Sequence, residues 1–132
     1  MIHARNYAGG VRGTDLIAFC DPSEECLNEA ASEIEVPYVY KDYNEALKNP
    51  EIDAVIVVTP TRFRHDVVIA AAKAGKHVFC EKPMALDEKE CDEMIEACRA
   101  STAATPASRR DASAPSGKWS PKSAPSSTRK PT

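Results

Sequence analysis

The sequence predicts an α/β domain with a parallel sheet, followed by a tail without regular structure. Short apolar runs rich in β-branched residues alternate with segments whose apolar residues recur at helical spacing. The runs end in turn pairs such as Asp-Pro and Thr-Pro, and the alternation stops at Ala100. Strands separated by helices of about ten to fifteen residues favour parallel pairing through right-handed crossovers.

The first half of this alternation predicts two strands and two helices. Leu16–Cys20 is an apolar run that is too short for a helix and suits a strand buried on both faces. A helix with acidic residues near its N-terminus follows. Its apolar face consists of Leu27, Ala30, Ala31 and Ile34. Residues 38–40 predict a second strand, and Asp42 is expected to cap a brief helix over residues 44–48.

The second half contains the strongest strand signal. Residues 53–58 are nearly all β-branched, which predicts a central strand buried on both sides. An alanine-rich helix over residues 62–74 should end at Gly75, and residues 77–80 predict the next strand.

The last predicted helix begins at Asp87, where Glu90 stands three residues later as in a capping box. Its apolar stripe consists of Cys91, Met94, Ile95 and Cys98.

Length and charge divide the chain at residue 100. With 132 residues, the chain can hold one modest domain, which we place at residues 1–100. Residues 101–132 are rich in Ser and Pro, carry a net charge of +5 and have too few apolar residues to form a core, so we expect disorder. A frameshift is the alternative origin of this tail. The remaining net charge of −8 argues against specific nucleic-acid binding.

Cysteine usage and hydropathy indicate the compartment. Five cysteines without a C-x-x-C pair favour reduced thiols over a disulfide framework or a zinc site, and we expect no metal. The sequence shows neither an apolar run of membrane-spanning length nor the apolar region of a signal peptide. These features predict a cytoplasmic protein that does not bind membranes.

Chemistry is expected in the segment GKHVFCEKPMAL, residues 75–86. Lys82 follows a predicted strand, and the carboxyl ends of parallel strands face the ligand crevice of open α/β sheets. Taken alone, Glu81-Lys82-Pro83 is a weak signal and favours a solvated lysine in a turn over a functional group. The segments that precede it in the sequence favour a functional Lys82 over a solvated turn.

Three segments in order, DLIAFCDP, EIDAVIVVTP and AAAKAGKHVFCEKPM, resemble the nucleotide-binding half of the Gfo/Idh/MocA oxidoreductases, the glucose-fructose oxidoreductase and inositol dehydrogenase family. The resemblance runs from about residue 1 to residue 99. It implies a Rossmann-type, doubly wound parallel sheet. It also implies hydride transfer between nicotinamide and a hydroxyl-bearing carbon of a sugar or cyclitol.

The resemblance also assigns roles to individual residues. It implies that Asp21 accepts hydrogen bonds from the adenosine ribose, which favours NAD over NADP; a helix cap before Pro22 is a second role that the same carboxylate can fill. It implies that the turn formed by Thr59, Pro60 and Thr61 packs against the dinucleotide. Lys82 is the expected catalytic residue.

In the same signature, Lys82 is implied to lie near the nicotinamide, where it stabilises alkoxide charge or relays a proton. Pro83 holds the turn, and Glu81 either orients Lys82 or belongs to a salt-bridged turn. Where the family usually has a histidine, this chain has Arg64, and we do not transfer the histidine's role to His65.

The resemblance further implies missing parts. The first strand and the glycine-rich phosphate loop would lie before Met1, and Gly9, Gly10 and Gly13 are interpreted as an ordinary loop after a first helix. A sheet lacking its first strand predicts marginal stability and self-association. The substrate domain of the family would follow residue 100, so we expect the chain to be a fragment of an oxidoreductase with little or no activity alone. The alternative is a non-catalytic nucleotide-binding or interaction module.

Overall fold

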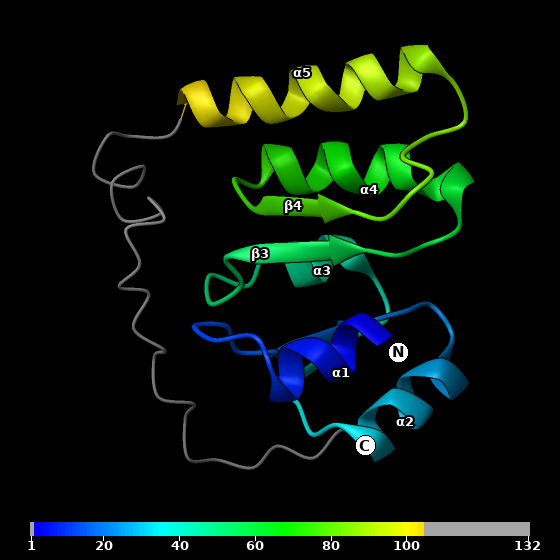
Figure 1. The fold of residues 1–132 in the computed structure, drawn as a ribbon, viewed down its shortest axis with the longest axis vertical. Coiled ribbons are helices and arrows are strands. Elements are labelled where there is room, and N and C mark those ends of the chain that lie inside the picture. The colour runs from blue at the N-terminus through cyan, green and yellow to red at the C-terminus, as the bar shows by residue number, and fades with distance from the viewer. Residues whose placement is uncertain (1, 105–132) are drawn as a thin grey trace. The chain divides into compact units, whose positions relative to one another are not determined.

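The computed structural model describes residues 2–104, so residues 105–132 of the tail predicted over 101–132 lie outside the described part. Within that part, the chain forms two compact units that meet in sequence between Ala46 and Leu47. Figure 1 shows helices and strands alternating along the chain, as predicted. Each unit contributes one pair of parallel strands.

The first unit holds α1 (Ile2–Gly9), β1 (Ala18–Cys20), α2 (Glu24–Glu33) and β2 (Tyr38–Tyr40). The pairing of β1 with β2 is parallel and aligns the two strands residue for residue. Parallel pairing requires a crossover, and α2 supplies it. The strand β1 is two residues shorter than predicted, because regular pairing begins only at Ala18.

Local hydrogen bonds define the start of α2. Ser23 is its N-cap, and the Ser23 hydroxyl accepts a hydrogen bond of 3.3 Å from the Cys26 amide. The apolar face predicted for this helix contributes Leu27 and Ala30 to the buried core, together with Val36 from the following turn. Capping and burial together explain why the helix forms here.

The second unit begins at the end of α3 (Tyr43–Leu47) and contains β3 (Ala54–Val57), α4 (Thr61–Lys73), β4 (His77–Cys80) and α5 (Glu88–Ala104). The strands β3 and β4 are parallel. In Figure 1, α4 and α5 lie side by side along this strand pair.

The core of the second unit lies between the strand pair and these two helices. Val57 from β3, Val68 from α4 and Met94 from α5 are each at most 3% exposed and form one cluster. Half-buried residues such as Val55 and Val78 pack around it. Burial of this apolar surface is what holds α4 and α5 on the sheet.

The predicted end of α4 at Gly75 and the predicted start of α5 at Asp87 are both confirmed. Gly75 has a φ of 74°, and the next residue, Lys76, donates a hydrogen bond of 3.0 Å to the Ala71 carbonyl, which closes α4 with a left-handed cap. The Asp87 carboxylate accepts a hydrogen bond of 2.9 Å from the Glu90 amide at the start of α5.

The C-terminal limit of α5 differs from the prediction. The helix continues four residues beyond Ala100 and ends at Ala104. Within this extension, the Thr102 hydroxyl donates a hydrogen bond of 3.0 Å to the Cys98 carbonyl. Polar residues on an exposed helix face cost little, which is why composition alone placed the boundary too early.

The prediction that β1 and β3 are buried on both faces is wrong for the described strands. These strands belong to two two-stranded sheets, β1–β2 and β3–β4. Cys20 is exposed in β1, Ala54 is exposed in β3, and only Val57 of β3 is fully buried. A strand paired along one side and covered on one face cannot bury all of its side chains.

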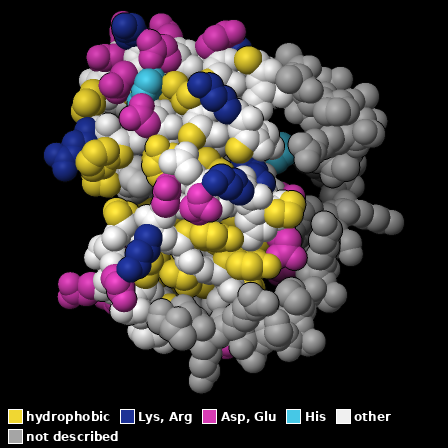
Figure 2. Space-filling view, turned by 180° about the vertical axis from the view of Figure 1, so that it is seen from behind, with side chains coloured by type: hydrophobic (Ala, Val, Ile, Leu, Met, Phe, Trp, Pro, Cys, Tyr) yellow, Lys and Arg dark blue, Asp and Glu magenta, His cyan; other side chains and the backbone are white. Residues whose placement is uncertain are grey.

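In the described part of the chain, we find no helix with the length and apolarity needed to cross a membrane. Instead, acidic side chains gather over α5 at the top of Figure 2. The acidic residues of α5 are Glu88, Glu90, Asp92, Glu93 and Glu96.

Candidate functional site

Two turns lie together at the carboxyl end of the β3–β4 pair. Val57 is the register partner of Cys80, and the next residue, Glu81, donates an amide hydrogen bond of 3.0 Å to the Val57 carbonyl. Thr59 and Lys82 each lie two residues beyond these paired ends. Parallel pairing therefore brings the two predicted site segments, residues 59–61 and 81–83, to the same edge of one sheet.

Arg64, in the first turns of α4, connects these two segments. Its Nε donates a hydrogen bond of 2.7 Å to the Thr59 carbonyl, and its Nη1 donates one of 2.7 Å to the Glu81 carbonyl. The same Nη1 also donates to the Pro83 carbonyl. The residue is only 7% exposed, although it carries a positive charge. Main-chain oxygens on two turns thus share one buried guanidinium.

Lys82 lies between two of these carbonyl acceptors and is exposed. Its main-chain amide donates a hydrogen bond of 2.9 Å to Glu81 Oε1, so the Glu81 carboxylate closes the turn locally. Glu81 was expected either to orient Lys82 or to belong to a salt-bridged turn, and this hydrogen bond to the main chain stabilises the turn. The Lys82–Pro83 peptide bond is cis.

Thr59 supplies a second unusual feature at this edge. Its Oγ1 is buried and has no hydrogen-bond partner among the described residues. The following helix α4 starts at Thr61 after Pro60, which provides no side-chain cap. A buried hydroxyl without a partner beside an uncapped helix N-terminus fits a polar ligand that donates and accepts hydrogen bonds.

Asp21 belongs to the first unit and follows β1 directly. Its amide donates a hydrogen bond of 3.1 Å to the Tyr40 carbonyl, and its Oδ1 accepts one of 2.8 Å from the Ser23 amide. The N-cap of α2 is Ser23, which was not identified from the sequence, so the capping role considered for Asp21 is not seen. The Asp21 carboxylate instead closes the turn that leads into this helix.

The glycines near the N-terminus lie after a helix rather than before one. Gly9 is the last residue of α1, which corrects the expectation that it follows the helix. Gly10 donates a hydrogen bond of 2.9 Å to the Asn6 carbonyl, and Gly13 has a φ of 83°. A phosphate loop instead joins a strand to a helix N-terminus. Gly9, Gly10 and Gly13 therefore do not form such a loop, as the sequence predicted.

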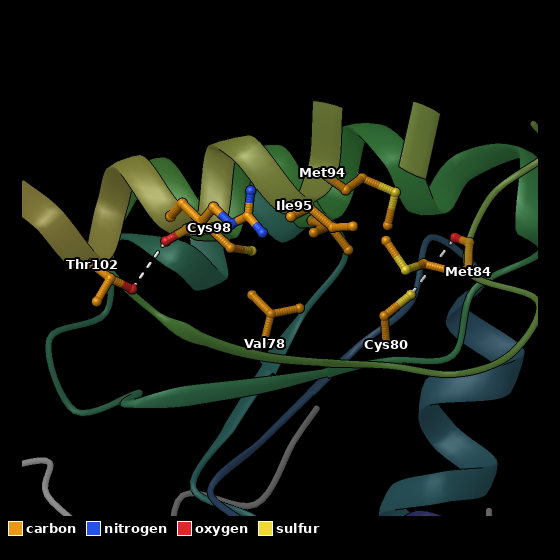
Figure 3. A pocket seen from close by; sticks show the side chains of 9 residues that line it. Val78, Cys80, Met84, Met94, Ile95, Cys98 and Thr102 are labelled. Carbon is orange, nitrogen blue, oxygen red and sulfur yellow. Dashed lines mark hydrogen bonds between the residues drawn. The ribbon is translucent and has the colours of Figure 1, made fainter. Parts of the chain in front are cut away.

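A separate groove of about 690 Å³ opens between β4 and α5. Figure 3 shows Met84, Met94, Cys98 and Cys80 around it, and the Cys80 thiol donates to the Met84 carbonyl at 3.8 Å. Burial raises the pKa of this thiol. The lining is largely apolar and contains none of the predicted site residues.

Arg64 is the residue at this edge whose structural role was not recognised from the sequence, where it was noted only in place of an expected histidine. A stronger signal was available, because Arg64, Val68 and Ala71 recur at i, i+4 and i+7 and therefore share the buried face of α4. A charged residue on that face requires partners, and turn carbonyls are the nearest acceptors.

Comparisons with known proteins agree with this geometry. Residues 2–105 match a family described as an oxidoreductase family with an NAD-binding Rossmann fold. Myo-inositol 2-dehydrogenase from Thermotoga maritima is 42% identical over 95 residues, covering 72% of this chain and 28% of the relative. The scyllo-inositol 2-dehydrogenase (NAD(+)) of Bacillus subtilis is 40% identical over 88 residues, which are 67% of this chain and 26% of that protein.

A solved structure is similar as well. The scyllo-inositol dehydrogenase of Lactobacillus casei, determined with bound NAD(H) and scyllo-inositol, superimposes with a TM-score of 0.72 at 31% identity. The match covers 77% of this chain and 30% of that one. The chain thus spans less than a third of the length of these relatives.

Proposed function

Because the chain belongs to the Gfo/Idh/MocA oxidoreductase family, we propose that it forms part of the NAD-binding domain of a dehydrogenase acting on a cyclitol or sugar. The observation that carries this proposal is the shared edge of β3 and β4, where the Thr59 and Lys82 turns meet. Bound NAD would accept the hydride from the hydroxyl-bearing carbon. The residues of the chain would bind and orient the cofactor and the substrate, and would move the proton of the substrate hydroxyl.

Lys82 is the proposed catalytic residue. Its ammonium stands on an exposed turn at the ligand edge, while its backbone is held on both sides by Arg64. An ammonium placed there stabilises negative charge developing on the substrate oxygen and relays the hydroxyl proton. The relatives are named as dehydrogenases of myo-inositol and scyllo-inositol, which supports a cyclic polyol as the substrate.

The Thr59 hydroxyl and the residues Pro60 and Thr61 form the proposed wall of the dinucleotide site. The buried Thr59 Oγ1 supports this role, since a ligand group would supply its missing partner. Asp21 is proposed to accept hydrogen bonds from the adenosine ribose. A carboxylate at that place repels a 2′-phosphate, which favours NAD over NADP.

Calorimetric titration of the 132-residue chain with NAD⁺, NADH and NADP⁺ tests the proposal. We expect saturable binding of NAD⁺ with a Kd on the order of 1 mM, equivalent to about 4 kcal/mol, and weaker binding of NADP⁺. Lys82→Met should abolish any NADH formation with myo-inositol, whereas Lys73→Met, which removes an exposed lysine from the far end of α4, should have no effect. Absence of NAD⁺ binding would refute the proposal.

A second candidate is an interaction module that pairs its strands with another chain. The division of the described strands into two pairs favours it, because short sheets with open edges recruit further strands. Sedimentation of the same chain with and without NAD⁺ separates the candidates. A stable oligomer that is indifferent to NAD⁺ supports the module.

A further inference from the structure

We propose that Arg64 is a positioning residue that fixes Lys82 at the dinucleotide site. This inference rests on the function proposed above. The guanidinium ties the turn after β3 to the turn after β4, and two of its three acceptors, the carbonyls of Glu81 and Pro83, belong to the neighbours of Lys82 in sequence.

The geometry of these contacts explains why an arginine is needed. Its planar head presents donors in several fixed directions, so a single side chain can reach the Thr59 carbonyl through Nε and the second turn through Nη1. A lysine at this position would offer a point charge on a flexible stem and could not span both turns in the same geometry. Methionine fills a similar volume but has no donors.

The contacts also leave the catalytic group available. Arg64 binds main-chain oxygens on either side of Lys82 and makes no described contact with its side chain. The Lys82 amide is fixed in turn by Glu81 Oε1. The backbone of Lys82 is therefore held while its ammonium stays exposed for a ligand. Moving a catalytic group by about 1 Å can lower the reaction rate on the order of 100-fold, so the position of Lys82 is important for activity.

The test uses the 132-residue chain and its variants Arg64→Met, Arg64→Lys and Lys73→Met. Circular dichroism checks that each variant folds. The ¹⁵N order parameter of the Lys82 amide measures how rigid the turn is. The ¹³C signal of dimethylated Lys82 measures the response of the side chain to NAD⁺, and this signal is assigned by its absence in Lys82→Arg. The control residue Lys73 is an exposed cation in the last turn of the same helix.

We expect Arg64→Met to lower the Lys82 order parameter from about 0.85 toward 0.6 and to weaken NAD⁺ binding by on the order of tenfold. Arg64→Lys should lie between this variant and wild type, and Lys73→Met should match wild type. A folded Arg64→Met with unchanged Lys82 order and NAD⁺ response would overturn the inference.

If Arg64→Met does not fold, Arg64→Lys decides, because wild-type values in that variant would also refute positioning. If wild type itself does not respond to NAD⁺, the proposed function fails. The order parameter then still shows whether Arg64 fixes the Lys82 turn.

Discussion

His65 Nε2 lies 2.6 Å from Glu93 Oε2, and this contact joins α4 to α5 across the surface of the second unit. On the other side of the ring, Nδ1 lies 3.0 Å from Asp66 Oδ1. The hydrogen bonds to Asp66 and then Glu93 raise the pKa of His65 above its ordinary value of 6.5. The sequence analysis did not assign His65 a site role, and the structure gives it this helix-joining contact.

This arrangement predicts that the second unit loses stability as the pH rises above 6.5 and through the raised pKa of His65. A raised folded-state pKa means that the stabilisation is complete below pH 6.5 and disappears as the pH rises through the folded value. Since Glu93 and Asp66 are exposed, the effect should be no more than about 1 kcal/mol. Urea unfolding between pH 5.5 and 8.5 measures it.

His65→Gln provides the control for this pH dependence, because its amide keeps a hydrogen-bond donor but does not titrate. Its unfolding free energy should vary less over the same range. Glu93 also lies near a cation, since Lys89 Nζ is 3.9 Å from Glu93 Oε1, and this contact is present in both proteins. An equal slope in wild type and variant would assign the effect to other groups.

The core cluster predicts a sharp contrast between two neighbouring residues of α5. Met94 is 1% exposed and contacts Val57 and Val68, whereas Ile95 is 41% exposed. Met94→Ala should reduce the unfolding free energy by about 2 to 5 kcal/mol, since it leaves a cavity, and Ile95→Ala by less than about 1 kcal/mol. Chemical denaturation of both variants is the measurement. Similar losses would show that α5 does not pack as described.

The cap of α2 predicts a local effect of Ser23→Ala. Loss of the hydroxyl that accepts from the Cys26 amide should cost about 1 kcal/mol and speed amide exchange in the first turn of α2. Ser23→Asp should retain protection because it supplies another acceptor beside the positive end of the helix. Hydrogen exchange followed by NMR distinguishes the two, and unchanged exchange in Ser23→Ala would refute the cap.

The proposed ribose contact predicts that Asp21→Asn changes the choice of cofactor. The amide oxygen can still accept from the Ser23 amide, but the negative charge is lost. Affinity for NADP⁺ relative to NAD⁺ should rise about tenfold, which corresponds to about 1.4 kcal/mol. As a control, Asp15→Asn also removes one negative charge, but on the N-terminal side of β1. It should leave the ratio of NADP⁺ affinity to NAD⁺ affinity unchanged. Titration with both nucleotides gives the ratio.

Local signals in the sequence were sufficient for most elements. The strand at residues 38–40, the strand at residues 77–80 and the caps at Gly75 and Asp87 agree with the structure, because each depends on neighbours within a few residues. The end of α5 was misplaced, since nothing local distinguishes its last exposed turn from a loop.

The sequence by itself determined the order of strands and helices and the family resemblance, which the comparison with known proteins confirms. It also predicted chemistry at the segments around Thr59 and Lys82, which stays a prediction. Only the tertiary structure decided that β3 and β4 bring these segments to one edge and that Arg64 joins them. The physical reason is that strand register and the partner of a buried charge depend on contacts between residues far apart in the chain, which local spacing does not encode.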